Sequence, residues 1–288
     1  MSVTNTMVKT GHADIAVAET SGSGLPVLFI HGNSGCKEMF RKQLASDMAD
    51  VYRMVAMDLP GHGASSDAFD PERSYSMIGY ADAVMETLAA MGIDRAVVCG
   101  WSLGGHVGME LLPRFSGLAG LMICGAPPVG RSPEEIQAGF RPTPHIGLAG
   151  KPELSQEDVE IFVRATCGEP VDEVMRQAIV RTDGRARAMM FASLFAGQAS
   201  DERKLAVNSA VPLAVVNGAD DPLVNLDYVG GLPYGNLWDA HCYVLRGAGH
   251  APFLHAPDAF NKILTRFVGD MERRPMRTGA KASDTAAA

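Results

Sequence analysis

The stretch Val97–His106, VVCGWSLGGH, decides the fold because a run of apolar residues ends in a serine flanked by glycines. Gly100, Ser102 and Gly104 match the pattern GxSxG, in which a strand turns sharply into a helix and leaves the serine hydroxyl exposed. A side chain at either glycine would collide with neighbouring elements as the chain reverses. The apolar residues before Ser102 predict a buried strand and those from Leu103 onward predict a helix, so the pattern stands in the setting that it requires.

The composition indicates one large globular domain with a small, neutral or amphiphilic substrate. The chain has 288 residues, of which 47% are hydrophobic, enough for a sizeable core. A net charge of -8 and the lack of a Lys/Arg-rich run before the tail argue against nucleic acid or an anionic membrane as a partner. No segment approaches about 18 uninterrupted apolar residues, and the N-terminus has no signal-peptide pattern. We therefore expect a cytoplasmic monomer or weak homo-oligomer that does not enter a membrane.

Neither a disulfide framework nor a metal site is indicated. The cysteines are odd in number, scattered and without a CxxC pair, so we interpret them as reduced, mostly buried thiols: Cys36, Cys99, Cys124, Cys167 and Cys242. No two histidines stand at the spacing of HxH or HExxH. We predict a protein that needs no metal and no cofactor.

Apolar runs that alternate with helical patterns predict an α/β fold with a mostly parallel, eight-stranded sheet and helices on both faces. Met7–Thr10 and Ala13–Glu19 flank a Gly11-His12 turn and predict an antiparallel hairpin. Buried parallel strands are expected at Val27–Ile30, Tyr52–Met57, Ala96–Cys99, Leu121–Cys124, Leu213–Val216 and Cys242–Leu245. Core helices are expected at Lys37–Met48, Met77–Met91, Leu103–Arg114 and Pro257–Val268.

The alternation stops after Pro127-Pro128, and only helical patterns follow until Leu213, which predicts an inserted helical cap. Its helices are expected at Glu157–Thr166, behind the N-cap candidate Ser155, and at Val171–Phe195. The end of the chain is polar, small and without periodicity. We therefore expect a core in two parts (1–128 and 211–270), a cap (129–210) and a disordered tail (271–288).

A serine hydroxyl becomes a nucleophile only when a base takes its proton, so Ser102 requires a histidine at the same edge of the sheet. His250 follows the strand Cys242–Leu245 on a loop that returns to that edge, and it is the candidate base. His255 is the competitor. It lies near the start of the final helix, where we expect it to cap or pack.

The acid that orients the base is expected in NGADDPLV, at the end of the strand before the base loop. Asp221 is favoured over Asp220 because Pro222 fixes the turn directly after it. The alternative is that both aspartates only cap the turn. The chain order of serine, aspartate and histidine is then satisfied.

A tetrahedral oxyanion needs two N–H donors, and the loss of one typically costs about 3 kcal/mol of transition-state stabilisation. The amide of Leu103, at the start of the helix, is one candidate. The other is the amide of Asn33 in HGNSG (His31–Gly35), the loop after the strand Val27–Ile30. The candidate nucleophile, base, acid and oxyanion donors all fall at the carboxyl ends of predicted strands.

Together these motifs resemble an α/β-hydrolase with a helical cap, over roughly residues 7–268. The family's motifs stand in order as HGN, DLPGHG (Asp58–Gly63), GWSLGG, NGADDP and GAGHAPF. Within that superfamily the chain is most similar to the metal-independent N-acyl-homoserine lactonases, through RSYSMIGYAD (Arg73–Asp82), TCGEP (Thr166–Pro170) and RTDGRAR (Arg181–Arg187). The last two segments lie in the predicted cap, and caps differ between members of the superfamily that act on different substrates.

The resemblance implies that Ser102 opens a lactone ring through an acyl-enzyme, with Asp221 and His250 completing the triad and Asn33 and Leu103 binding the oxyanion. The implied partner is a small acyl lactone or ester. That lactonase group has a Glu-Pro pair where this chain has Asp221-Pro222, and aspartate is the usual acid of the superfamily.

The predicted cap offers apolar side chains for an acyl tunnel. We expect Trp101, Phe140, Phe162 and Met190 to contact the substrate, and Ile146, Met189, Phe191 and Phe195 are further candidates. The alternative for each cap residue is the cap's own core, since such residues at helical spacing usually pack there.

Two other functions remain open for the same fold. A general carboxylesterase or C–C bond hydrolase would use the same triad with a different pocket. A non-catalytic small-molecule receptor would not need the base, whereas this chain retains Ser102, Asp221 and His250.

Overall fold

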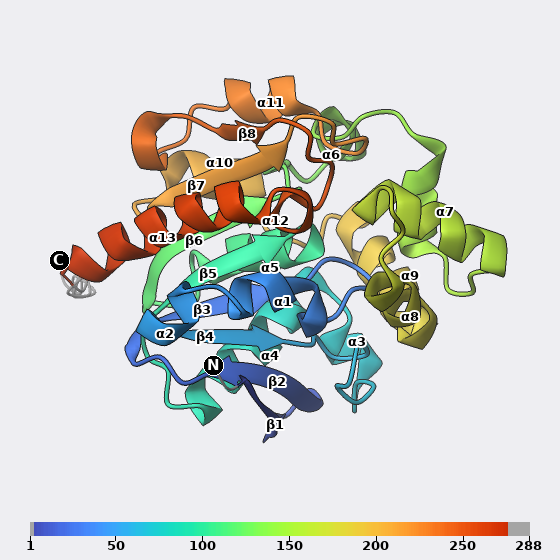
Figure 1. The fold of residues 1–288 in the computed structure, drawn as a ribbon. Coiled ribbons are helices and arrows are strands. Elements are labelled where there is room, and N and C mark those ends of the chain that lie inside the picture. Colours follow the sequence, from blue (N-terminus) through green and yellow to red (C-terminus); the bar gives the residue numbers. More distant parts are fainter. Residues whose placement is uncertain (1–2, 276–288) are drawn as a thin grey trace, which may run out of the picture.

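The computed structural model describes residues 3–275, so residues 276–288 of the predicted tail lie outside the described residues. Its strands form one sheet in the order β1-β2-β4-β3-β5-β6-β7-β8 (Figure 1). β1 and β2 form an antiparallel hairpin, β2 pairs antiparallel with β4, and the other neighbours pair in parallel. The predicted fold class is confirmed. The strand bounds are β1 (Val3–Lys9), β2 (Asp14–Thr20), β3 (Gly24–Ile30), β4 (Tyr52–Met57), β5 (Ala96–Trp101), β6 (Leu118–Cys124), β7 (Leu213–Gly218) and β8 (Tyr243–Leu245).

Two hydrophobic clusters, one on each face of the sheet, hold the helices. Along β3, Val27 and Phe29 belong to one cluster and Leu28 and Ile30 to the other, because successive side chains of a strand point to opposite faces. The first face carries η1 (Lys37–Phe40), α1 (Arg41–Leu44), α2 (Met48–Val51), α12 (Pro252–His255) and α13 (Pro257–Arg273). The second carries α4 (Met77–Ala90), α5 (Leu103–Leu111) and α10 (Glu202–Asn208).

The helices inserted between β6 and β7 are α6 (Pro133–Ala138), η2 (Pro144–Gly150), α7 (Gln156–Cys167), α8 (Glu173–Arg181), α9 (Gly184–Phe195) and α10. Of these, α7, α8 and α9 lie together at one end of the molecule (Figure 1). The predicted N-cap of α7 is confirmed, since the Ser155 side chain accepts the N–H of Asp158 at 3.1 Å. The division into core and cap stays a prediction. Short elements with too few turns for periodicity went unpredicted, namely α3 (Pro71–Ser74), α11 (Leu226–Gly231) and η3 (Trp238–Ala240), besides α6, η2, α10 and α12.

Two helices predicted as continuous are broken in the structure. The predicted helix Lys37–Met48 is divided into η1, α1 and the start of α2, and at the break the Ser46 hydroxyl donates to the Gln43 carbonyl at 2.7 Å. The predicted helix Val171–Phe195 is divided into α8 and α9. There the Asp183 side chain accepts the N–H of Arg185 and starts a new helix.

The last helix is longer than predicted. α13 continues past the predicted end at Val268 and ends at Arg273, inside the region predicted as a tail. The reason is burial: Met271 is fully buried and packs against Gly120 of β6.

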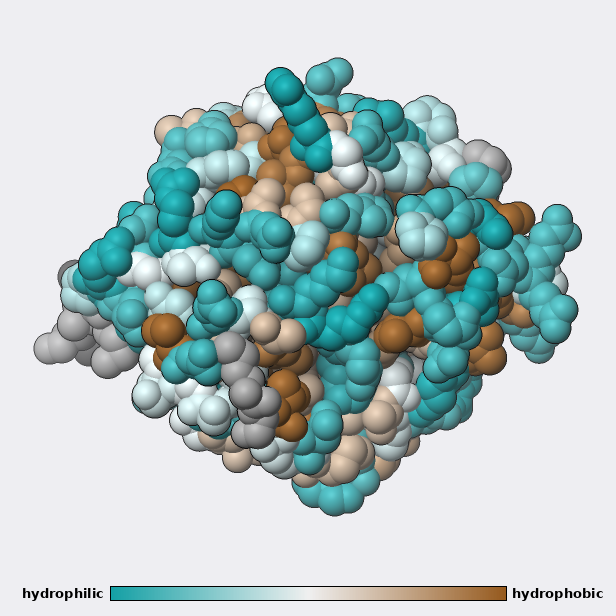
Figure 2. Space-filling model, viewed as in Figure 1, coloured by the Kyte–Doolittle hydropathy of each residue, from teal (hydrophilic) through white to brown (hydrophobic). Residues whose placement is uncertain are grey.

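The viewed surface is mostly hydrophilic, with hydrophobic residues in small scattered groups (Figure 2). Within residues 3–275, no helix combines the length and apolarity needed to cross a membrane. All five cysteines lie among the described residues as free thiols, and four of them are buried. Burial raises the pKa of Cys167 to about 12, so this thiol stays protonated.

The turn between β5 and α5 brings three backbone segments into direct contact. A Cβ on Gly104 would lie 2.0 Å from the carbonyl oxygen of Ile30, and a Cβ on Gly100 would lie 2.2 Å from the carbonyl oxygen of Gly104. Both distances are far below van der Waals contact, so only glycine fits at these positions. The sharp turn predicted from GxSxG therefore has a steric cause in the packing of β3, β5 and α5.

We expect Gly104→Ala to lower the free energy of unfolding by about 2–3 kcal/mol or more, because α5 must move away from Ile30. Gly230→Ala is the matched control, since a Cβ there would meet nothing within 4 Å, and a gain of up to about 1 kcal/mol is expected in the helix. Urea unfolding of both variants measures the difference. Equal stabilities would contradict the steric account.

Candidate active site

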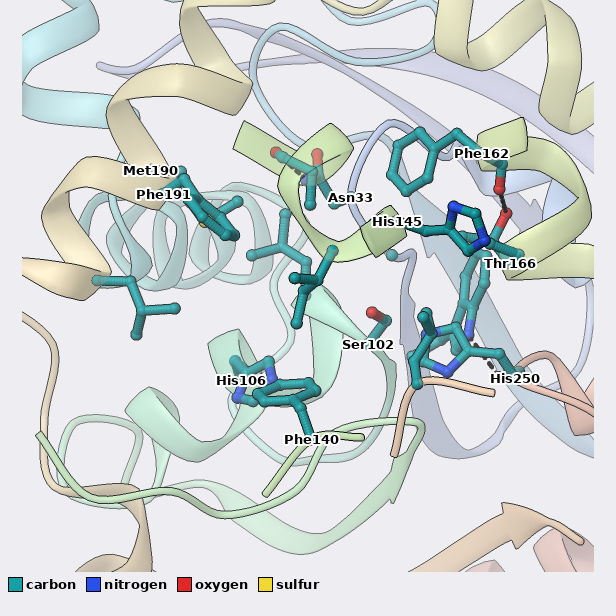
Figure 3. Close-up of a pocket in the computed structure, with 18 of the residues that line it drawn as sticks. Asn33, Ser102, His106, Phe140, His145, Phe162, Thr166, Met190, Phe191 and His250 are labelled. Carbon is teal, nitrogen blue, oxygen red and sulfur yellow. Dashed lines mark hydrogen bonds between the residues drawn. The ribbon is translucent and has the colours of Figure 1, made fainter. Parts of the chain in front are cut away.

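Ser102 occupies the turn after β5 in a backbone conformation that non-glycine residues rarely adopt. Its φ is 51° and its ψ is -117°, which typically costs about 1–3 kcal/mol and persists only where the surroundings hold it. Its N–H donates to the carbonyl of Cys124 in β6 at 2.8 Å. The conformation places the side chain in the wall of a cavity between the sheet and the inserted helices (Figure 3).

Asp221, rather than Asp220, lies against the candidate base. Its Oδ2 is 2.9 Å from Nδ1 of His250, and its Oδ1 accepts the N–H groups of Leu223 at 2.8 Å and Val224 at 3.1 Å. Burial opposes ionisation of Asp221, but His250 and the two N–H donors outweigh it and lower the pKa of the carboxyl. Asp220 is exposed. The ionised Asp221 is thus suited to hold the Nδ1–H of the imidazole.

The other ring nitrogen of His250 is buried at the cavity. Within residues 3–275, Nε2 has no hydrogen-bond partner, and His250 lines the same cavity as Ser102 (Figure 3). The indole N–H of Trp101 donates to the carbonyl of His250 at 2.9 Å, which fixes the base loop. An imidazole held at Nδ1 and open at Nε2 has the arrangement needed to accept a proton from a hydroxyl.

His255 lies outside the residues that line this cavity. Its Nδ1 accepts the N–H of Gly249 at 3.0 Å, so its Nε2 carries the hydrogen and donates to the carbonyl of Cys167 at 2.5 Å. His255 therefore joins the loop of His250 to the end of α7, which agrees with the packing role expected for it.

The two candidate oxyanion donors both lie on the cavity wall. Leu103 is the first residue of α5, where an N–H has no partner within the helix. Asn33 follows β3, and its side-chain amide donates to the carbonyl of Ala149 in η2 at 2.7 Å. Beside it, His31 donates from Nδ1 to the Gly32 carbonyl at 2.7 Å and accepts the Leu59 N–H at Nε2, which holds the loop.

The cavity wall contains all four side chains predicted to contact the substrate: Trp101, Phe140, Phe162 and Met190. Ile146, Phe191 and Phe195 also line it, whereas Met189 packs in the second hydrophobic cluster. The sequence reasoning missed three polar residues of the wall, His106, His145 and Thr166. For His106 a signal was available, because it follows Ser102 at the helical spacing of four residues.

Arg187 of α9 connects the inserted helices to the loop of Asn33. Its guanidinium is buried and donates to the carbonyls of Lys151 and Pro152, both at 2.9 Å, and to the Ser34 hydroxyl at 3.3 Å. Burial lowers the pKa of Arg187, and the nearby Asp183 opposes this shift. Main-chain carbonyls thus supply most of the compensation for a buried cation.

We expect Arg187→Met to lower the free energy of unfolding by about 2–4 kcal/mol, because several buried carbonyls lose a charged donor. Arg185→Met is the control on the same helix. Arg185 is exposed, and water can replace its contact with Asp183, so a much smaller loss is expected. Thermal and urea unfolding of the two variants test this, and similar losses for both would contradict the assignment.

Known proteins resemble this chain in both sequence and structure. The model of the alpha/beta hydrolase family matches residues 27–263. The crystal structure of N-acyl homoserine lactonase AidH with N-butanoyl homoserine is 45% identical, with a TM-score of 0.90, covering 96% of this chain and 99% of that chain. A mutant of AidH with N-hexanoyl homoserine is 46% identical, with a TM-score of 0.92, covering 95% and 99%.

Esterases are similar to the chain at lower identity. An esterase of a Rhodococcus species is 27% identical, with a TM-score of 0.74, covering 94% of this chain and 100% of that chain. The pimeloyl-[acyl-carrier protein] methyl ester esterase of Nitrosospira multiformis is 25% identical, covering 86% of this chain and 96% of that protein. The chain spans only 66% of the dihydrolipoyllysine-residue acetyltransferase component of the acetoin cleaving system of Cupriavidus necator, with 28% identity over 88% of this chain.

Proposed function

Because the chain belongs to the alpha/beta hydrolase family, as predicted, we propose that it is a serine hydrolase that opens the ring of N-acyl homoserine lactones. The observation that carries the proposal is its 46% identity to AidH, which spans 95% of the chain and therefore includes the inserted helices. Those helices build much of the cavity wall, and pocket walls vary with substrate more than the turn around Ser102 does.

In the proposed mechanism, the Ser102 hydroxyl attacks the lactone carbonyl while Nε2 of His250 takes its proton. Asp221 holds the imidazole and stabilises the imidazolium without accepting the proton. The amides of Leu103 and Asn33 bind the oxyanion. When the ring C–O bond breaks, His250 returns the proton to the leaving alkoxide. The resulting hydroxyl stays on the homoserine part, whose carbonyl carbon is now bonded to Ser102.

The second half of the reaction repeats this chemistry with water. His250 takes a proton from water, the hydroxide attacks the acyl-enzyme, and the Ser102 oxygen leaves with the proton. The product is the open N-acyl homoserine, one water heavier than the lactone. The apolar side chains of the wall, such as Phe162 and Met190, would hold the acyl chain.

We expect Ser102→Ala to lower kcat for N-hexanoyl homoserine lactone by about 10⁴-fold or more, because the nucleophile is lost. Mass spectrometry of the wild-type reaction should give a product with one added water and an intact amide. Free homoserine lactone would mean amide cleavage. Absence of any product from the wild-type protein would contradict the proposed function, and unchanged turnover in the variant would contradict the role of Ser102.

The neighbouring aspartates provide a matched test of the acid. We expect Asp221→Asn to lower kcat by about 10³–10⁴-fold, because the asparagine no longer stabilises the imidazolium and favours the wrong tautomer. Asp220→Asn should change kcat by less than about threefold, since the Asp220 side chain is exposed. Steady-state kinetics of both variants measure this, and equal effects would refute the assignment of Asp221.

A general carboxylesterase is the second candidate, favoured by the similarity to the esterase from Rhodococcus. A carboxylesterase would use Ser102, His250 and Asp221 in the same roles and would differ from a lactonase only in its substrate preference. The ratio of kcat/KM for an acyl homoserine lactone to that for a 4-nitrophenyl ester of the same acyl length distinguishes the two. A ratio far below one would favour the esterase.

A further inference from the structure

A second pair of histidine and carboxylate lies at the same cavity, four residues after Ser102. His106 on α5 lines the cavity, and its Nδ1 is 3.0 Å from Oε1 and 2.8 Å from Oε2 of Glu202 on α10. Both side chains are buried, and the N–H of Val129 also donates to Glu202 at 3.4 Å. Within residues 3–275, no hydrogen bond reaches Nε2 of His106. Nε2 is therefore the polar atom that the ring can offer to a ligand, and the proposed mechanism leaves this pair without a role.

The chemistry of the ring decides what Nε2 can bind. An imidazole nitrogen donates a hydrogen bond when it bears a hydrogen and accepts one when it does not. A secondary amide offers both a carbonyl acceptor and an N–H donor, so an amide can pair with Nε2 in either state.

Nε2 of His106 stands in an apolar part of the wall. The rings of His106 and Phe140 have centroids 6.2 Å apart, and Ile136 and Leu223 also line the cavity. In Figure 3, His106 lies beside Phe140, and Ser102 lies between His106 and His250. A polar atom in such surroundings is paired by water or by a polar group of the ligand.

The position of His106 relative to Ser102 restricts which ligand group it can reach. Both residues line the cavity, and the N–H of His106 donates to the carbonyl of Ser102 at 3.2 Å, so the two residues lie one turn apart. A ligand atom that bonds to His106 is therefore only a few covalent bonds from the carbon that Ser102 attacks. In an N-acyl homoserine lactone, the amide group lies at this separation from the ring carbonyl, whereas a simple fatty acid ester has no second polar group there.

We propose that His106, held by Glu202, forms a hydrogen bond through Nε2 with the amide group of the substrate, and so makes the site specific for acyl-amide lactones over simple esters. The inference rests on the proposed lactonase function. When the amide substrate is bound, Nε2 of His106 has a hydrogen-bond partner. When a simple ester is bound, Nε2 is left unpaired, and this cost favours the amide substrate over the ester.

The test compares N-hexanoyl homoserine lactone with 4-nitrophenyl hexanoate for the wild-type protein, His106→Leu and His106→Gln. We expect His106→Leu to lower kcat/KM for the lactone by about 10–100-fold and for the ester by less than about threefold. The glutamine amide can place a donor or an acceptor near the position of Nε2, so His106→Gln should recover most of the lactone activity. If His106→Leu does not fold because Glu202 is left alone, His106→Leu combined with Glu202→Leu replaces the pair with apolar side chains.

The outcomes separate this inference from the function on which it rests. Equal losses on both substrates would mean that His106 supports the position of Ser102, and would overturn the inference while leaving the lactonase function intact. Unchanged activity on both would also overturn it. A wild-type protein that cleaves the ester but not the lactone would instead overturn the proposed function.

Discussion

The close approach of Gly104 to the carbonyl of Ile30 is the constraint on which the rest of the site depends. It brings the first turn of α5 against the end of β3, so the amide of Leu103 and the loop of Asn33 face the same cavity. The same turn holds Ser102 at a φ of 51° and directs the next turn of the helix, with His106, along the cavity wall. One backbone contact thus fixes the relative positions of groups from two strands and one helix.

The site is shared between the sheet and the inserted helices, and polar contacts hold the two together. The sheet side provides Ser102, Asp221 and His250, whereas residues such as Phe162 and Met190 come from the insertion. The insertion also holds the sheet's loops, because Asn33 donates to η2, Arg187 reaches Ser34, and His255 joins the base loop to α7. The geometry of the sheet edge therefore depends on how the insertion is seated.

The sequence predicted those parts of the site that lie at strand ends, because alternating strands and helices bring such ends to one edge. That principle was enough to select Ser102, Asp221 and His250 as neighbours. It did not reveal the contact between His106 and Glu202, which are 96 residues apart in sequence and on different helices. The breaks at Ser46 and Asp183 were missed because side-chain competition for backbone groups, rather than hydrophobic periodicity, decides them.

Three of the contacts between sheet and insertion share one feature with an evolutionary consequence. Asn33, His255 and Arg181 all donate to main-chain carbonyls across the boundary, at Ala149, Cys167 and Ser65. A main-chain acceptor survives nearly any substitution at its own position. Mutations in the insertion can therefore accumulate and reshape the cavity while these attachments to the sheet persist, which gives lineages with this architecture a route to new cavity shapes on an unchanged framework.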